Sequence, residues 1–448
     1  MLARGRSLLS LGVYVLVFGC GDSPGHRVDT AHPPAGAGGA GGRGGAGGAP
    51  GGGEAGQGGS PNDPDVGSKV DAAMPGGTDA SGGLQPDASP GGDVSDGGPA
   101  ACPLGAEAAM LDVEAVAVTN EAGGPPGKGD AVTVRLRVRN AGAAGAKVSF
   151  TPLLSSARFS DFEAVPLGTT TATVCPGNEA SFVDVTGGPF LSDPAAGKHY
   201  ALGSGDYTVA AVTLAATDAA GSMDRDFTGG RFTVETSNAL LVPVFYDPQY
   251  FARIEGFRGT PAEYMTQAFT RPGEIFTPAS SADPDGEGTY RTFARGFDQM
   301  MGVRHHFRLF EGFARRADDL AGWCESAAVH ARETLGMPTA WTGSGTRRDR
   351  HGFDYLIALT PNMGGGVACG WLDVQLSSFI NRDLDRQQII AVHESAHLFG
   401  SPHCDDVGNG SGGNLQSYVM CAGEKHAHYP QTFVWHSTSI AQMKSRWD

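Results

Sequence analysis

The sequence predicts an α+β domain at the C-terminal end of the chain, preceded by an all-β sandwich and a disordered glycine-rich linker. Three observations predict this order. The segment HESAHLFGSPH lies in a helical pattern that follows alternating strands and helices, residues 102–236 alternate apolar and polar side chains, and residues 21–101 are dominated by small residues. A chain of 448 residues is long enough for two folded domains and an unstructured segment. The predicted boundaries are 1–20, 21–101, 102–236 and 237–448.

The first twenty residues resemble a lipoprotein signal peptide. Arg4 and Arg6 precede the apolar run Leu8–Phe18, which is too short to span a bilayer. The run ends in Val17-Phe18-Gly19-Cys20, which resembles a lipobox with Cys20 as the lipidated residue. We therefore expect an exported protein anchored by lipid to the bacterial cell envelope, at the outer membrane or the cell surface. An ordinary secretory signal is the alternative, and no other segment is apolar enough to cross a membrane.

Residues 21–101 are predicted to form a tether. Glycine, alanine, proline, aspartate and serine dominate this segment, so it has too little apolar surface to offset the entropy lost on ordering. A flexible chain of this length has a root-mean-square reach of roughly 50 Å. Such a tether would hold the folded domains clear of a membrane surface.

Residues 102–236 predict the sandwich. Ala131–Val138 places a valine or leucine at every second position, and Tyr207–Leu214 and Arg231–Glu235 have the composition of further short strands. The segment Leu136–Gly142 resembles the strand and turn of immunoglobulin-like and CARDB-type adhesion modules, which implies an immunoglobulin-like sandwich. We find no group of candidate catalytic or metal-binding residues in this segment. The domain is expected to be a spacer or a module that recognises a surface, with an inhibitory pro-domain as the alternative.

From residue 237 the pattern changes to strands alternating with helices. The expected elements, in order, are a strand at Leu240–Tyr246, a helix within Glu311–Leu335, a buried strand at Phe353–Leu359, an edge strand at Val367–Val374, a helix at Arg386–Phe399 and a closing helix at Ser437–Arg446.

The segment HESAHLFGSPH predicts a three-histidine zinc site. Residues four apart lie on one face of a helix, so His393 and His397 can turn a ring nitrogen toward one ion, with Glu394 about 100° round the helix. Gly400 is suited to the left-handed conformation that ends a helix. His403 can then return to the metal from outside the helix, which leaves one coordination position open.

The helix that carries these residues has its own sequence signals. Asp385 and Gln388 have the form of a capping box at its start. Ile389, Val392 and Ala396 lie at helical spacing and form an apolar stripe. One side of the helix is therefore expected to face a core, while the neighbouring side carries the metal ligands.

A second segment supports the zinc site. Ser417–Cys421 contains Met420 and resembles a Met-turn, so that the last 210 or so residues resemble the metzincin zinc endopeptidases, most closely the reprolysin (adamalysin) branch. Cys404 stands where that branch carries aspartate. The resemblance implies a mixed twisted sheet with an active-site helix, structural support from Gly400 and Met420, and an edge strand near Ala368–Asp373 that pairs with an extended substrate.

The expected function is a zinc endopeptidase that acts on protein or peptide substrates. Zn²⁺ would lower the pKa of a water to roughly 7, and Glu394 would accept its proton and deliver it to the leaving amine. The alternatives are a non-catalytic adhesion lipoprotein with a vestigial protease domain and a metallohydrolase of another acyl bond. A formal net charge of −16 argues against nucleic acid as a partner. The oligomeric state is left open.

The cysteine count is consistent with export. There are seven cysteines, and assigning Cys20 to lipidation leaves six. Pairing them by domain predicts the disulfides Cys102–Cys175, Cys324–Cys369 and Cys404–Cys421. Six cysteines allow 15 connectivities, so these pairs are a hypothesis. A free thiolate of Cys404 or Cys175 that binds zinc is the alternative.

A few other polar residues are weaker candidates. His426, His428 and His436 follow the Met-turn and could line a subsite or hold a second metal, although packed or solvated histidines are favoured. The loop Asp283–Glu287 is favoured as a solvated turn over a calcium site. His305 and His306 are expected to be structural.

Overall fold

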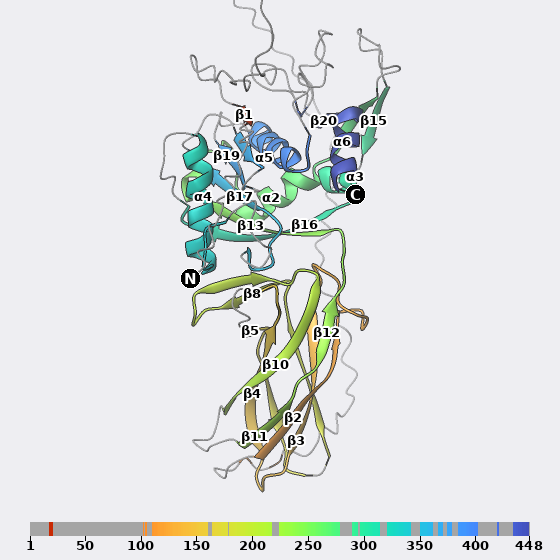
Figure 1. Ribbon diagram of the computed structural model, residues 1–448, viewed down its shortest axis with the longest axis vertical. Helices are drawn as coiled ribbons and strands as arrows, with labels where there is room; N and C mark the ends of the chain where they lie inside the picture. The colour runs from red at the N-terminus through yellow and green to blue at the C-terminus, as the bar shows by residue number, and fades with distance from the viewer. Residues whose placement is uncertain are drawn as a thin grey trace, which may run out of the picture. The chain divides into compact units, whose positions relative to one another are not determined.

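Two β-sheets packed face to face form the first folded part of the chain (Figure 1). One sheet contains β2 (Met110–Thr119), β3 (Val132–Asn140), β7 (Ser181–Gly187) and β11 (Asp224–Thr228). The other contains β4 (Ala146–Ser155), β5 (Ala164–Pro166), β6 (Thr170–Val174), β10 (Gly205–Ala216) and β12 (Arg231–Val234).

The computed structural model describes most of the chain from residue 110 onward. The described residues are 18–20, 102, 104, 110–159, 164–177, 179–216, 224–277, 289–293, 296–313, 320–341, 350–361, 366–370, 374–378, 384–401, 419–420 and 433–447. The predicted tether lies outside them. In the described part, no helix is both long and apolar enough to span a membrane.

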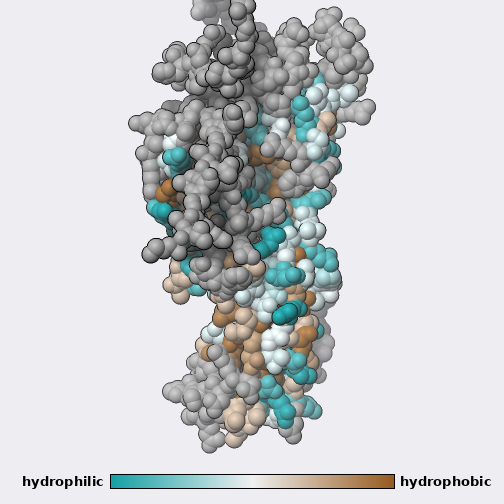
Figure 2. All heavy atoms as spheres, in the orientation of Figure 1, coloured by the Kyte–Doolittle hydropathy of each residue, from teal (hydrophilic) through white to brown (hydrophobic). Residues whose placement is uncertain are grey.

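Apolar and polar side chains alternate along each strand, and the apolar ones form the sandwich core. On β3, Val132, Val134 and Leu136 are fully buried, while Arg135 on the opposite face pairs with Asp184 at 2.7 Å. Side chains of a strand alternate between faces, so one face of each sheet is apolar and the other polar. On the face drawn in Figure 2, hydrophilic and hydrophobic residues are mixed over the sandwich.

A hairpin connects the sandwich to the rest of the chain. It consists of β8 (Phe190–Asp193) and β9 (Lys198–Ala201). The Ala201 amide donates to the His351 carbonyl at 2.8 Å, and the rings of Phe190 and Phe353 stack at 6.0 Å between centroids. The sandwich and the C-terminal part therefore pack against each other directly.

A six-stranded mixed sheet forms the centre of the C-terminal part (Figure 1). Its order is β1 (Phe18–Cys20), β18 (Gly366–Cys369), β19 (Val374–Ser378), β17 (Leu356–Thr360), β13 (Ala239–Tyr246) and β16 (Arg304–Glu311). Strands β19, β17, β13 and β16 are parallel, whereas β18 and β1 pair antiparallel at one edge.

The remaining elements are helices and a small sheet. The helices are α1 (Pro248–Ala252), α2 (Pro261–Thr270), α3 (Phe297–Met301), α4 (Leu320–Leu335), α5 (Leu384–Leu398) and α6 (Ser437–Trp447). The small sheet contains β14 (Gly273–Thr277), β15 (Thr289–Phe293) and β20 (Phe433–His436).

Strand β13 is buried on both faces because a core lies on each side of the mixed sheet. Leu240, Val242 and Val244 face the core that includes α5, whereas Leu241 and Phe245 face the core that includes α4. Burial on both faces is typical of a parallel strand between helices. This arrangement fixes α5 against one face of the sheet.

Two of the sequence predictions for this part were wrong in extent. The predicted edge strand Val367–Val374 is two strands, because the chain turns at Gly370 and returns as β19 inside the sheet. The helix predicted within Glu311–Leu335 is described as α4 from Leu320 to Leu335, and the first residues of the predicted stretch are not helical. Glu311 instead ends β16, and Gly312 follows with a φ of 103°, which a helix does not tolerate.

Two disulfides lie within the described residues. Cys102 is bonded to Cys175 in the sandwich, and Cys324 of α4 is bonded to Cys369 of β18. These are two of the pairs predicted by domain. The hypothesised third pair, Cys404 with Cys421, lies outside the described residues.

Candidate metal centre

Helix α5 brings the central residues of the motif into the core. Its apolar stripe, including Val392 and Ala396, is fully buried against the mixed sheet. Helix α5 already includes Leu384, so the predicted capping box at Asp385 was wrong: this residue lies in the first turn, and its carboxylate accepts from Arg271, which follows α2. A salt bridge to the end of α2 thus replaces the predicted local cap.

The first two histidines of the motif face each other. The Nε2 atoms of His393 and His397 are 3.1 Å apart, and the ring centroids are separated by 4.7 Å. The two residues are 2% and 9% exposed. Their spacing of four residues therefore turns both rings to one side of the helix, as the sequence predicts.

Backbone carbonyls hold both rings from the other side. His393 Nδ1 donates to the Val419 carbonyl at 2.5 Å, and His397 Nδ1 donates to the Ser401 carbonyl at 2.6 Å. A carbonyl can only accept, so each Nδ1 carries a proton, and the two Nε2 atoms face each other at hydrogen-bonding distance. Metal-ligating histidines are commonly oriented by such hydrogen bonds.

The facing Nε2 atoms can hold a proton or a cation between them. Their separation of 3.1 Å is that of an N–H···N hydrogen bond when one Nε2 is protonated, and two unprotonated nitrogens at this distance need a positive ion near both. In a tetrahedral zinc site with bonds of about 2.0–2.1 Å, two ligand nitrogens are about 3.3–3.4 Å apart. The observed separation is close to that value. The donor set is therefore suited to a divalent metal ion with nitrogen ligands.

Glu394 lies beside these nitrogens. It is 0% exposed, and neither carboxylate oxygen has a hydrogen-bond partner among the described residues. Burial raises the pKa of this carboxyl well above its ordinary value, because the charged form loses its hydration. Ligand atoms from His393, Glu394 and His397 all lie within 4.8 Å of one another. A buried carboxylate without a partner is costly unless a cation or a proton compensates it.

The structure brings together two of the three predicted metal ligands and the predicted base. His403 lies outside the described residues, as do His426, His428 and the loop Asp283–Glu287. Gly400 has a φ of 89°, and its amide donates to the His397 carbonyl at 2.9 Å, which ends the helix. Met420 is 1% exposed in the core that includes α5.

Sequence reasoning missed the two carbonyls that orient the rings. Val419 and Ser401 contribute backbone oxygens, so their side chains carry no signal of this role. The Val419 amide donates to the Val434 carbonyl of β20 at 2.8 Å, which anchors the turn that contains Met420. The proximity of Val419 to the predicted Met-turn methionine was the one available hint.

The other candidate histidines have structural surroundings. His305 Nδ1 contacts Asp298 Oδ1 at 2.5 Å, and its Nε2 contacts the Tyr355 hydroxyl at 2.7 Å. His436 accepts from the Thr438 amide at 3.2 Å at the start of α6, and burial lowers its pKa. Burial also lowers the pKa of His306. None of these three belongs to the cluster on α5.

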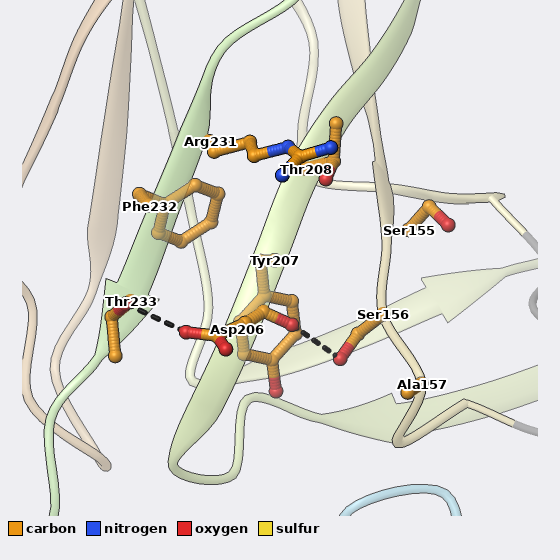
Figure 3. Close-up of a pocket in the computed structure, with 9 residues that line it drawn as sticks. All are labelled: Ser155, Ser156, Ala157, Asp206, Tyr207, Thr208, Arg231, Phe232 and Thr233. Atoms are coloured by element: carbon orange, nitrogen blue, oxygen red, sulfur yellow. Dashed lines mark hydrogen bonds between the residues drawn. The ribbon is translucent and has the colours of Figure 1, made fainter.

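A separate hollow of about 550 Å³ lies on the sandwich (Figure 3). Arg231, Thr208 and Ser155 are cross-strand neighbours on β12, β10 and β4 and line it together. Asp206, which also lines it, accepts from the Thr233 hydroxyl at 2.8 Å. The hollow has a mixed polar and apolar lining, and the residues that line it include no pair of groups suited to acid–base or metal chemistry.

Comparisons with known proteins identify no relative. No family model matches the chain, and no curated protein matches it. Among solved structures, a β-glucosidase from Kluyveromyces marxianus has 16% identity over 28% of this chain and 14% of its own, with a TM-score of 0.19. The alkylpurine DNA glycosylase AlkC from Pseudomonas fluorescens has 12% identity over 28% of this chain and 31% of its own, with a TM-score of 0.18. The matched part spans less than a third of either protein, and such scores support no conclusion about fold or activity.

Proposed function

We propose that this chain is a zinc-dependent endopeptidase of the metzincin type. One observation carries the proposal: a fully buried Glu394 without a partner among the described residues lies beside two histidine Nε2 atoms that face each other at 3.1 Å. A structural cluster would pair a buried carboxyl with a donor. A buried carboxyl that has none among the described residues, next to two histidine rings, is typical of a site that binds a metal and a substrate.

Each residue has a role in this proposal. His393 and His397 would hold the metal through Nε2, with His403 as the predicted third ligand. Zinc bound there would polarise a peptide carbonyl and lower the pKa of a water to about 7. Glu394 would accept a proton from that water as its oxygen adds to the peptide carbonyl carbon, and would deliver the proton to the amine that leaves when the C–N bond breaks.

The edge of the mixed sheet supports a polypeptide substrate. Strand β18 packs next to α5, and its outer edge pairs antiparallel with the extended segment Phe18–Cys20. Processing of a lipoprotein signal at Cys20 would remove Phe18 and Gly19, and the amides and carbonyls of this edge could then bind another extended chain without regard to its side chains. A substrate on this edge would run past Glu394.

The proposed location is the exported side of the cell envelope, with a lipid on Cys20 and the glycine-rich tether between anchor and enzyme. The disulfides of the sandwich and of α4 suit an oxidising compartment. In this view the sandwich is a spacer or a surface-recognition module, and its direct contact with the C-terminal part through β8 and β9 argues against a removable pro-domain.

A digest of casein and of a peptide library tests the proposal. The full chain should cleave them, a chelator should abolish cleavage, and added Zn²⁺ should restore it. Glu394→Gln should retain one zinc per chain and lose about 10²–10⁴-fold in kcat, because it cannot accept a proton. Full activity of Glu394→Gln would remove the residue from its role.

Two alternatives have distinct outcomes in the same experiment. Zinc binding without any hydrolysis would favour a vestigial domain in an adhesion lipoprotein. Hydrolysis of esters or other acyl compounds without peptide cleavage would favour a different metallohydrolase. The intact Glu394 beside the histidine pair favours the peptidase over the vestigial domain.

A further inference from the structure

Gly366, the first residue of β18, has no conformational need to be glycine. Its φ lies outside the left-handed region, and it pairs in regular antiparallel register with Ser377 of β19. An alanine could adopt this backbone conformation without strain. The reason for glycine here must therefore lie in the surrounding space.

That space is occupied by the carboxylate of Glu394. A Cβ built on Gly366 would lie 2.7 Å from Glu394 Cδ, closer than real Cβ atoms approach other heavy atoms. Both residues are buried, so the carboxylate cannot swing into solvent to make room. The Glu394 side chain thus rests directly against the backbone of the edge strand.

We propose that Gly366 is a positioning residue for Glu394. Because Gly366 has no side chain, the Glu394 carboxylate can occupy the space between α5 and β18. The proposal rests on the proposed function, in which Glu394 is the proton acceptor. Strand β18 is also the edge that pairs with an extended chain, and Cys20 stands opposite Gly366 in that pairing. Glycine at this position therefore keeps the carboxylate close to the backbone on which a substrate would lie.

A side chain at position 366 would move the carboxylate rather than unfold the strand. A displacement of about 1 Å can cost about 10²-fold in rate when the moved group takes part in the reaction. We expect Gly366→Ala to bind zinc as the wild type does and to lower kcat about 10²-fold, with KM changed by less than about threefold. Gly370→Ala is the matched control, since nothing lies within 4 Å of a Cβ built on Gly370, the residue that follows β18.

A thermal-unfolding cycle tests the contact without any activity. Gly366→Ala should lower Tm in the wild-type background and should have little effect in the Glu394→Ala background, where the obstructing carboxylate is gone. Gly370→Ala should shift Tm equally in both backgrounds. If Gly366→Ala fails to fold but folds when combined with Glu394→Ala, the contact is likewise supported.

The outcomes separate this inference from the proposed function. Equal Tm shifts in both backgrounds, failure to fold in both, or a kcat for Gly366→Ala equal to that of Gly370→Ala would overturn it. If the wild type cleaves no peptide, the proposed function fails, while the unfolding cycle still reports whether Gly366 and Glu394 are coupled.

Discussion

Two buried polar clusters in the C-terminal part differ in how their hydrogen bonds are satisfied. The first, which we call the structural cluster, joins Asp298, His305 and Tyr355. Asp298 accepts from both the backbone amide and the ring of His305, and the far ring nitrogen contacts the Tyr355 hydroxyl. The second is the metal centre on α5, where both oxygens of Glu394 lack a partner among the described residues.

The comparison shows that burial of a histidine is not in itself a sign of function. His305 is 9% exposed and His393 2%, so exposure does not separate the two clusters. What separates them is the balance of donors and acceptors. The structural cluster closes its own hydrogen bonds and contributes to stability, whereas the metal centre bears a cost that a bound ion would offset.

The largest expected change in stability comes from a substitution that disrupts the structural cluster. Asp298→Ala removes two acceptors from His305 and should lower the free energy of unfolding by about 3 kcal/mol, measured by denaturant titration. Asp298→Asn keeps an acceptor and should cost less. A loss below about 0.5 kcal/mol for Asp298→Ala would show that the cluster does not support the fold.

Removal of the buried carboxyl from the metal centre should have the opposite effect and stabilise the metal-free chain. In metal-free protein, Glu394→Ala removes a buried carboxylate without a partner in the described part, and should raise the free energy of unfolding by about 1 kcal/mol. The gain should disappear when zinc is added to the wild type. Destabilisation of the metal-free chain by Glu394→Ala would mean that Glu394 has a structural partner, and would weaken the distinction between the clusters.

The smallest expected effect concerns His199, in the hairpin that contacts the C-terminal part. Its Nδ1 contacts the Ser192 hydroxyl at 2.9 Å, and burial, followed by the charge of Arg308, lowers its pKa. The unfolded chain then binds a proton more readily than the folded chain. Stability contributed by neutral His199 is therefore present above the unfolded pKa of about 6.5 and is lost as pH falls through that value.

Thermal unfolding at a series of pH values tests the direction of this pH dependence. The Tm of the wild type should fall between pH 7 and pH 5 more than that of His199→Gln, which does not titrate in this range. Parallel curves for the two proteins would show that His199 is not linked to folding. The effect should be small because the residue is only partly buried.

Local sequence patterns predicted much of the fold. Period-two alternation located β3, β10 and β12, and helical spacing located α5. The errors occurred where two elements meet without a strong break in composition. A run of apolar residues concealed the turn at Gly370, and the end of β16 was included in the helix that follows it.

For the candidate site, too, the sequence predicted some features and the folded structure was needed for others. The sequence by itself determined the residues that cluster on α5, because the spacing of His393, Glu394 and His397 sets their direction on any helix. Only the tertiary structure decided which groups surround them. The Val419 carbonyl and the backbone of Gly366 reach the site from 26 and 28 residues away along the chain, given by 419 − 393 and 394 − 366. A backbone oxygen is the same in every residue, and an absent side chain leaves no pattern, so neither contact is visible until the chain has folded.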